Sequence, residues 1–374
     1  MVKAISTIFK RFMGLATIVV SVLYLSTILL PFIDTGRFWY ISILGLGFIL
    51  LFFLLLFFLL FWLLMRSKSW IIICLVVILS GFQQIRAAFA FNLPKTFVLK
   101  KNPDSFRVMQ WNVHNWNQVK PDNGRRFDMN AYPAMMDLVK KYNGDVLCFE
   151  EFAEHLSRKK YPSNIATLKK MGYPYYYFLD NGMMENEYKA GVAVFSKFPI
   201  VDSGKVRLVK KTNTDPPAYV DIQNGDKRFR VIIIHLQSVH FKNEQYEQLS
   251  EMRKAKRPDI QGSKTIIAKL KKGFQIRNVQ AASVSRQVEE SPYPVMVCGD
   301  FNDVPNSGTY FTITKNLQDA FIKKGSFIGR TFRFISPTLR IDYILPDKNF
   351  KVEQFARIRA PYSDHYPIVA DLKF

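Results

Sequence analysis

Asp300 and Asn302 place a carboxylate and an amide close together, directly after an apolar run near the C-terminal end of the chain. The run Val295 to Cys298 predicts a buried strand, and Gly299 allows a tight backbone path where that strand stops. If the backbone stays extended, the two polar side chains point the same way; the other interpretation is a simple turn. A carboxylate can accept a proton from water, and an amide can hold the oxygen that water attacks. The pair therefore suits hydrolysis if other polar groups reach the same place.

Other polar residues occupy similar positions in the sequence. They follow runs that predict buried strands, or lie just before the final strand: Asn112, Glu151, His235, Asp364 and His365. Each of them alone could be a cap or turn residue. Polar groups that end several buried strands, however, commonly line a cleft. We therefore expect these side chains to lie near Asp300.

The part of the chain that carries these residues alternates short apolar runs with helical patterns. A helix is predicted over 131–142, with Asn143-Gly144 as its C-terminal stop. Strands interleaved with helices over this length predict an α/β (α+β) sandwich with buried sheets.

The N-terminal quarter of the chain has a different composition. The whole chain has 52 Lys and Arg against 30 Asp and Glu, but residues 1–95 hold eight basic residues and one acid, Asp34. We predict a transmembrane helical segment over 1–91, a linker over 92–104 and a catalytic domain over 105–374. Since roughly 20 apolar residues cross a bilayer, the expected spans are 12–33, 38–65 and 70–91. The third stretch is interrupted by Gln83, Gln84 and Arg86, so a buried or interfacial helix is its alternative.

Charges beside the spans predict the orientation. Basic residues near the N-terminus and at 66–68 favour a cytoplasmic N-terminus, with Arg37 in the opposite loop. Three spans then place the catalytic domain on the extracytoplasmic face of an integral protein of the inner or plasma membrane. The lipid bilayer is the expected partner, and nothing in the sequence indicates a protein partner.

Six ordered motifs resemble those of the endonuclease/exonuclease/phosphatase superfamily, and they span 106–374. They are Gln110-Trp111-Asn112-Val113, Asp145 to Glu151, Gly191 to Lys197, Gly299-Asp300-Phe301-Asn302, Arg340 to Leu345, and Ser363 to Ile368. The resemblance implies the four-layered sandwich of pancreatic-type deoxyribonuclease, with two packed mixed sheets flanked by helices. It also implies hydrolysis of phosphate esters with a divalent metal and without a covalent enzyme intermediate.

The resemblance also implies a role for each matched residue. Asn112, Glu151 and Asp364 match metal-side residues, with Mg²⁺ as the expected ion and Mn²⁺ as the alternative. Asp300 matches the group that activates water, and Asp342 the carboxylate that pairs with a histidine. The residues that match phosphate contacts are Asn302, His235 and His365.

Glu150 and Glu151 raise a question of register. Most family members have Gln then Glu at this position, so the match assigns the metal to Glu151 and leaves Glu150 at the Gln position. Because extended residues alternate faces, only one of the two can point at the metal.

The substrate stays open between two classes of phosphodiester. The leading hypothesis is a membrane-anchored nuclease-type phosphodiesterase acting on nucleic acid. The alternative is a sphingomyelinase-like enzyme acting on a phospholipid headgroup, and a non-catalytic binding module is a third hypothesis. The basic stretch 253–257, with Lys269, Lys271, Lys272 and Arg277, could follow a phosphate backbone, hold anionic headgroups, or form a solvated helical face.

Overall fold

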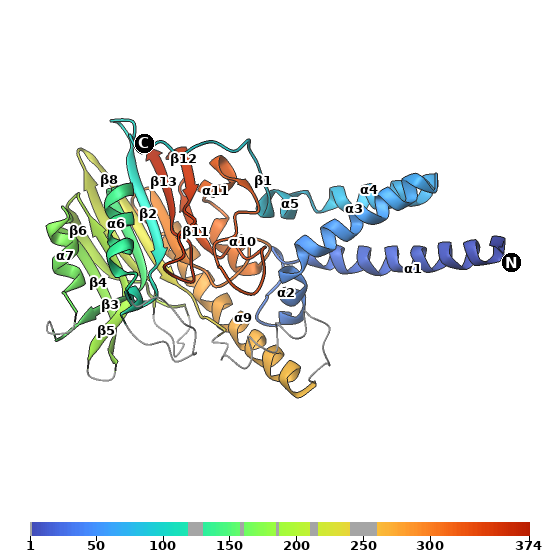
Figure 1. The fold of residues 1–374 in the computed structure, drawn as a ribbon, viewed down its shortest axis with the longest axis horizontal. Coiled ribbons are helices and arrows are strands. Elements are labelled where there is room, and N and C mark those ends of the chain that lie inside the picture. Colours follow the sequence, from blue (N-terminus) through green and yellow to red (C-terminus); the bar gives the residue numbers. More distant parts are fainter. Residues whose placement is uncertain (1, 119–129, 158–160, 185–186, 210–215, 240–259) are drawn as a thin grey trace.

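The structure is a computed structural model that describes residues 2–118, 130–157, 161–184, 187–209, 216–239 and 260–374. Its N-terminal part is helical and extends to one side of a sandwich of sheets (Figure 1). The helices of this part are α1 (Val2–Ile28), α2 (Trp39–Leu46), α3 (Phe48–Leu64), α4 (Lys68–Ser80) and α5 (Phe82–Ala88).

Two mixed sheets form the sandwich. The six-stranded sheet has the order β12 (Lys351–Arg357), β13 (Ile368–Lys373), β2 (Phe106–Asn112), β3 (Val146–His155), β5 (Tyr188–Ser196) and β4 (Tyr175–Met184). The five-stranded sheet has the order β11 (Asp342–Pro346), β9 (Val295–Asp300), β8 (Lys227–His235), β7 (Ala218–Asn224) and β6 (Ile200–Lys205). Each sheet contains one parallel pair, β2 with β3 and β8 with β9.

The sheets pack face to face and helices cover their outer faces, which gives four layers. Alternate residues of each central strand point to opposite faces. Val108 of β2, for example, packs between the sheets, whereas Met109 packs outward against α6 (Tyr132–Tyr142) and α7 (Asn164–Lys170). On the other side, Ile234 of β8 packs against α9 (Ile260–Glu289) and α10 (Gly308–Thr314). The predicted four-layered sandwich is confirmed.

The remaining elements are short. They are the 3₁₀ turn η1 (His114–Asn117), α11 (Ala320–Lys324), and the strands β1 (Ala90–Phe91) and β10 (Ser326–Phe327), which pair with each other. This pairing puts residues 90–91 in a strand that contacts the catalytic domain, so the helical part of the predicted third span ends at Ala88.

Two bends divide the N-terminal helices where straight spans were expected. The α2 and α3 axes meet at 63°, and the α4 and α5 axes at 60°. At the second bend, a Cβ atom on Gly81 would lie 2.1 Å from the Tyr24 hydroxyl, so only glycine allows this close packing. Among the described residues, α1 is long and apolar enough to cross a membrane, and up to three crossings result if each bent pair counts as one.

Segments of the N-terminal part also touch the sandwich. α2 packs against α9, and the Thr35 hydroxyl donates a hydrogen bond to Asn278 Oδ1 at 3.1 Å. The predicted linker is held in the same way, because Asn92 donates to the carbonyls of Ile322 and Gly325. The sandwich therefore has a defined position relative to the N-terminal helices.

Candidate active site

The ends of the two parallel strand pairs bring the predicted residues together. In the five-stranded sheet His235 pairs with Asp300, and in the six-stranded sheet Asn112 pairs with Glu150. Parallel strands end at the same edge of a sheet, and β2 and β3 both contact β9 across the sandwich. The expectation that polar groups gather at one rim is confirmed for these strands.

Gly299 allows Asp300 to leave its strand beside β8. Its φ is +145°, and an added Cβ would lie 2.0 Å from the Ile234 carbonyl oxygen, so no other residue fits. The backbone then turns instead of staying extended, and Asn302 has a φ of 50°. The Asn302 amide N–H donates to Asp300 Oδ1 at 2.8 Å. The turn is thus the correct interpretation of the Asp300–Asn302 spacing, because a short side chain readily accepts a hydrogen bond from the backbone two residues on.

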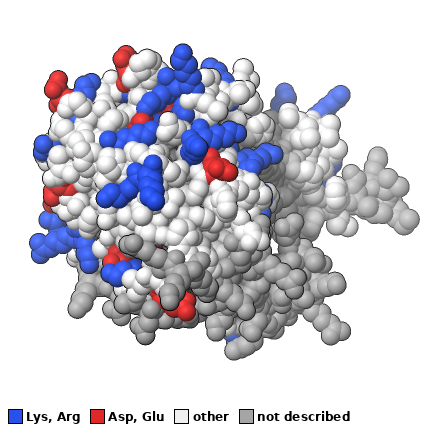
Figure 2. Space-filling model, turned by 60° about the vertical axis from the view of Figure 1, so that its left-hand side comes forward, with Lys and Arg blue, Asp and Glu red and all other residues white. Residues whose placement is uncertain are grey.

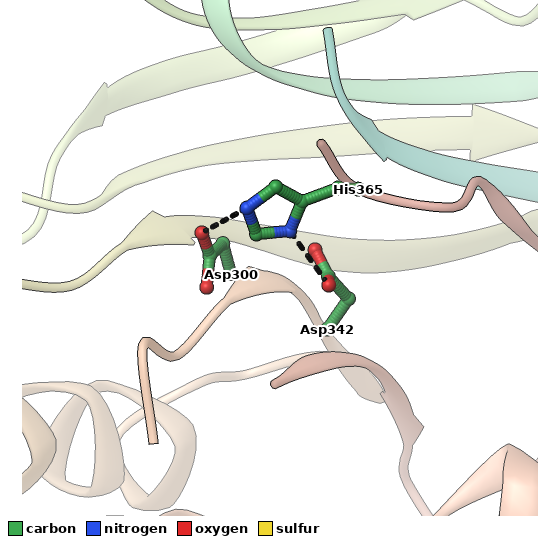
Figure 3. Close-up of side chains that lie close together, drawn as sticks. All are labelled: Asp300, Asp342 and His365. Carbon is green, nitrogen blue, oxygen red and sulfur yellow. Dashed lines mark hydrogen bonds and ion pairs between the residues drawn. The ribbon is translucent and has the colours of Figure 1, made fainter. Parts of the chain in front are cut away.

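The ring of His365 lies between two carboxylates (Figure 3). Its Nδ1 is 2.9 Å from Asp342 Oδ2, and its Nε2 is 3.6 Å from Asp300 Oδ2. All three side chains are at most 5% exposed. The predicted pairing of Asp342 with His365 is present in the structure.

Burial and the two carboxylates act in opposite directions on His365. Burial disfavours the charged ring, but Asp342 and Asp300 outweigh it and hold the pKa of His365 well above its usual range. Burial is the largest effect on Asp300 and raises its pKa to about 6, against the opposing charge of His365. The site therefore holds a cationic histidine beside a carboxylate that is a moderately strong base.

Asp300, Asp342 and His365 also lie close enough together to bind a metal ion. We interpret them instead as a histidine paired with two carboxylates, by a hydrogen bond to Asp342 and an ion pair with Asp300. Both ring nitrogens face a carboxylate, and a protonated imidazole has no lone pair to offer a cation.

A second group of side chains surrounds the Asn112 amide. Its Nδ2 lies 3.2 Å from Glu151 Oε1 and 3.3 Å from Asp300 Oδ2. His235 Nε2 lies 3.8 Å and 3.9 Å from the same two oxygens. Two carboxylates therefore face a common space with an amide and an imidazole beside them.

Glu151 reaches this space through a bulge. Its strand was predicted to end before it, but β3 continues to His155, and the register shifts between Phe149 and Phe152. Glu151 has a φ of 47° within this bulge. Simple alternation of faces therefore does not apply here, because the bulge re-aims the side chain. The Glu151 side chain is 33% exposed and faces the site.

Glu150 points the other way, into the protein. Its side chain is fully buried, and Oε2 accepts a hydrogen bond from Gln110 Nε2 at 2.7 Å. Gln110 Nε2 also lies 3.1 Å from Asp342 Oδ1. Burial, followed by the charge of Asp342, raises the pKa of Glu150 well above its usual range. Gln110 thus connects Glu150 to the Asp342–His365 pair, a role that its place in a motif did not show.

Asp364 and Asn302 lie at the margins of these groups. The Ser363 hydroxyl is 3.3 Å from Asp364 Oδ1 and 2.7 Å from the Asn112 carbonyl. Asn302 Nδ2 donates to the Leu236 carbonyl at 3.0 Å. Asn302 therefore joins the loops that follow β9 and β8.

The predicted basic surface after His235 is only partly described. Residues 253–257 lie outside the described residues. Lys271 and Lys272 are exposed on α9, and the Lys271 ammonium lies over the Trp39 ring. Arg277 is buried, where it pairs with Asp303 and donates to the Gln237 carbonyl at 2.8 Å. Its assignment to the basic surface is wrong, because packing of α9 against the β8 and β9 loops encloses it.

Comparison with known proteins adds family membership to this geometry. The model of the Endonuclease/Exonuclease/phosphatase family matches residues 109–365. The chain belongs to this family. Its members are phosphoric ester hydrolases, and the match includes every residue of the two groups described above. A second model, of a domain of unknown function, matches residues 10–88. The comparison with curated proteins gives no match.

The chain is also similar to solved structures. The human Nocturnin catalytic domain with bound sulfate is 19% identical, with a TM-score of 0.50, and the match covers 72% of this chain and 95% of that one. A 3′ phosphatase, NExo from Neisseria bound to a product DNA hairpin, is 16% identical, with coverage of 72% and 100% and a TM-score of 0.47. D. rerio TDP2 with a single-strand DNA product is 13% identical, with coverage of 72% and 99% and a TM-score of 0.45.

Proposed function

We propose that this chain is a membrane-anchored, divalent-metal-dependent phosphodiesterase of nuclease type. The observation that carries the proposal is the arrangement of the His365 ring between Asp300 and Asp342, beside the Asn112–Glu151 group. In one buried site, a histidine cation can donate to a phosphate and a carboxylate can accept a proton from water. This arrangement also argues against a non-catalytic binding module.

Asp300 is the base in this proposal. One of its oxygens, Oδ1, accepts the Asn302 amide N–H, which leaves Oδ2 facing Asn112, His235 and His365. A general base is most effective when its pKa lies near the working pH, and burial raises the pKa of Asp300 to about 6. Oδ2 accepts the proton of the attacking water.

His365 stabilises the phosphate. Asp342 accepts a hydrogen bond from Nδ1–H and so fixes the orientation of the ring. Nε2–H then donates to a phosphate oxygen on which charge develops. His235, and Asn302 beside it on the neighbouring loop, are the further donors to phosphate.

The donor chemistry of the second group fits a hard divalent cation. Glu151 and Asp300 bring two carboxylate oxygens to one space, and such oxygens are what Mg²⁺ and Mn²⁺ prefer. We assign the cation to the Glu151 carboxylate and to Oδ1 of Asn112, which also accepts the His114 amide N–H, with Asp364 as a further metal-side acid. When bound, the cation supplies charge stabilisation at the phosphate.

Nucleic acid is the substrate class that we propose. The whole chain has 52 basic and 30 acidic residues, and residues 1–95 hold eight and one of these, which leaves 44 basic and 29 acidic residues in 96–374. In Figure 2, Lys and Arg are spread across the upper part of the face, with few acids between them. Positive charge favours a polyanionic backbone. No observation in the described residues favours a phospholipid headgroup in the active site.

The anchor in this proposal is the N-terminal helical part. Its proposed crossings are α1, the α2–α3 pair and the α4–α5 pair, so that the α4–α5 pair is a third crossing and not an interfacial helix. The N-terminal end of α1 and the turn between α3 and α4 both lie far from the sandwich (Figure 1). An odd number of crossings then places the catalytic domain opposite the N-terminus, on the extracytoplasmic face of an inner or plasma membrane.

One assay tests the catalytic part of the proposal. The full chain, purified in detergent, is incubated with DNA, RNA, sphingomyelin and glycerophospholipids, in Mg²⁺, in Mn²⁺ and in a chelator. We expect cleavage of nucleic acid that the chelator abolishes and that His365→Ala reduces by at least about 10²-fold. Cleavage of lipid alone would contradict the assignment of nucleic acid as the substrate and favour a phospholipid. Activity that survives the chelator would contradict the metal assignment.

A further inference from the structure

A cavity of about 720 Å³ lies between α1 and the α3–α4 turn, at the end of the helices remote from the catalytic domain. We call it the α1–α3 pocket. Its lining combines cationic, aromatic and apolar side chains, among them Lys10, Arg11, Arg66, Trp62, Trp70 and Leu15.

One wall of the α1–α3 pocket is a pair of stacked indoles. The rings of Trp62 and Trp70 lie 5.0 Å apart at an interplanar angle of 11°. Trp62 Nε1 donates to the Thr17 hydroxyl at 3.0 Å, which ties this wall to α1. A Cβ on Gly14 would approach the Trp70 ring to 3.0 Å, so glycine lets the ring lie against the helix.

The turn places Arg66 at the rim. Arg66 has a φ of 54°, and its amide N–H donates to the Leu63 carbonyl at 3.0 Å. The Ser67 amide N–H donates to the Trp62 carbonyl at 3.1 Å. The tight turn thus directs a guanidinium to the same rim as the two basic residues of α1.

Among the described residues, no acid balances the charge of the α1–α3 pocket. Lys10, Arg11 and Arg66 line it, and residues 1–103 contain one acid, Asp34, which lies beyond the other end of α1. No ion pair in the described part of the chain involves these three cations. Below them, Leu15 and Ile18 offer apolar surface. An occupant must therefore carry negative charge at one end and be apolar at the other.

We propose that the α1–α3 pocket binds one anionic phospholipid, with its phosphate at Lys10, Arg11 and Arg66 and the start of an acyl chain along Leu15 and Ile18. The proposal rests on the proposed membrane anchor, which puts this end of the helices at the cytoplasmic interface. Tryptophan is enriched at that level of a bilayer, and Arg binds phosphate oxygens in a forked geometry.

Lys68 provides a matched control. It begins α4 two residues after Arg66 and carries the same charge at the same end of the helices, but it does not line the pocket. A general attraction of the interface for basic residues would involve Lys68 as much as Arg66. A specific site would not.

The experiment is native mass spectrometry of the full chain in detergent, titrated with dioleoylphosphatidylglycerol or dioleoylphosphatidylcholine. We expect one bound phosphatidylglycerol at concentrations where phosphatidylcholine does not bind. Arg66→Gln should weaken the binding of phosphatidylglycerol about fivefold, which corresponds to about 1 kcal/mol per basic residue near anionic lipid. The double variant Lys10→Gln/Arg11→Gln should weaken this binding more strongly. Lys68→Gln should leave binding unchanged.

Three results would overturn the proposal. They are equal binding of the two lipids, equal weakening by Lys68→Gln and Arg66→Gln, and displacement of the lipid by millimolar inorganic phosphate, which would indicate a simple phosphate site. Alkaline extraction of membranes separates this proposal from the anchor itself. A chain released by alkali would disprove the anchor, whereas an embedded chain without lipid selectivity would disprove only the pocket. Nuclease activity in detergent should not change in Arg66→Gln.

Discussion

Asp300 and Asp342 face each other as direct partners on the antiparallel strands β9 and β11. Two buried carboxylates on directly paired residues repel each other. The cationic ring of His365 lies between them and offsets that repulsion. The base and the cationic donor of the proposed reaction are therefore coupled to each other electrostatically. A change in either carboxylate should alter the proton affinity of the histidine.

Glu151 and Glu150 should differ sharply when changed to glutamine. Glu151→Gln removes the exposed carboxylate beside Asn112 and should lower kcat/KM by about 10²-fold or more. Glu150→Gln keeps the shape of a buried side chain that is already uncharged, and activity should stay within about threefold. Steady-state kinetics with Mg²⁺ will show the difference. The opposite ranking would mean that the metal-side residue is assigned to the wrong glutamate.

Glu150→Gln should also change how stability depends on pH. An acid whose pKa is raised in the folded state destabilises that state once the pH rises above the unfolded pKa, because the unfolded chain releases the proton while the folded protein keeps it. The variant should therefore gain melting temperature over the natural chain at pH 8, and gain little or nothing at pH 4. Thermal unfolding in detergent at the two pH values measures this. An equal gain in melting temperature at both pH values would show that the pKa of Glu150 does not differ between the folded and unfolded states.

Asp300→Asn should act on the chemical step. The amide keeps the size of the side chain but cannot accept a proton from water, so kcat should fall by about 10²- to 10⁴-fold while KM changes little. Substrate binding measured separately with the inactive variant should remain. A large rise in KM with kcat preserved would instead make Asp300 a binding residue.

Asp342→Asn should act through His365. Losing this carboxylate lowers the pKa of the histidine, so the cationic donor disappears at a lower pH than in the natural chain. The defect in kcat/KM should be small in mild acid and grow as pH rises. The double variant Asp342→Asn/His365→Ala should be little worse than His365→Ala alone, since residues that act as one unit are not additive. Multiplied losses would show that Asp342 has a contact of its own with metal or substrate.

Reporter fusions test the proposed membrane topology. Alkaline phosphatase fused after Phe374 should be active and a fluorescent protein fused there should be dark, because three crossings put the C-terminus outside. The same reporters fused after Ser67, in the α3–α4 turn, should give the opposite pattern and serve as the control. A fluorescent C-terminal fusion would mean that the α4–α5 pair does not cross.

Local patterns in the sequence determined a large part of this protein. Short continuous apolar runs predicted the buried strands, since a strand covered on both faces is apolar at successive positions. Gly299 marked the tight backbone path at the end of β9, and the ordered motifs predicted the family, the sandwich and the pairing of Asp342 with His365. These features depend on short stretches of sequence, or on residues that can be matched to the motifs of a family in their order along the chain.

Only the tertiary structure decided the relations between stretches. The bulge that aims Glu151 at the site, the bond from Gln110 to both Glu150 and Asp342, the burial of Arg277 and the bends at Gly47 and Gly81 have no local pattern. Each arises where surfaces from distant parts of the chain are packed together. A side chain's direction, charge state and exposure at such a contact depend on what packs against it, and the linear sequence does not contain that information in local form.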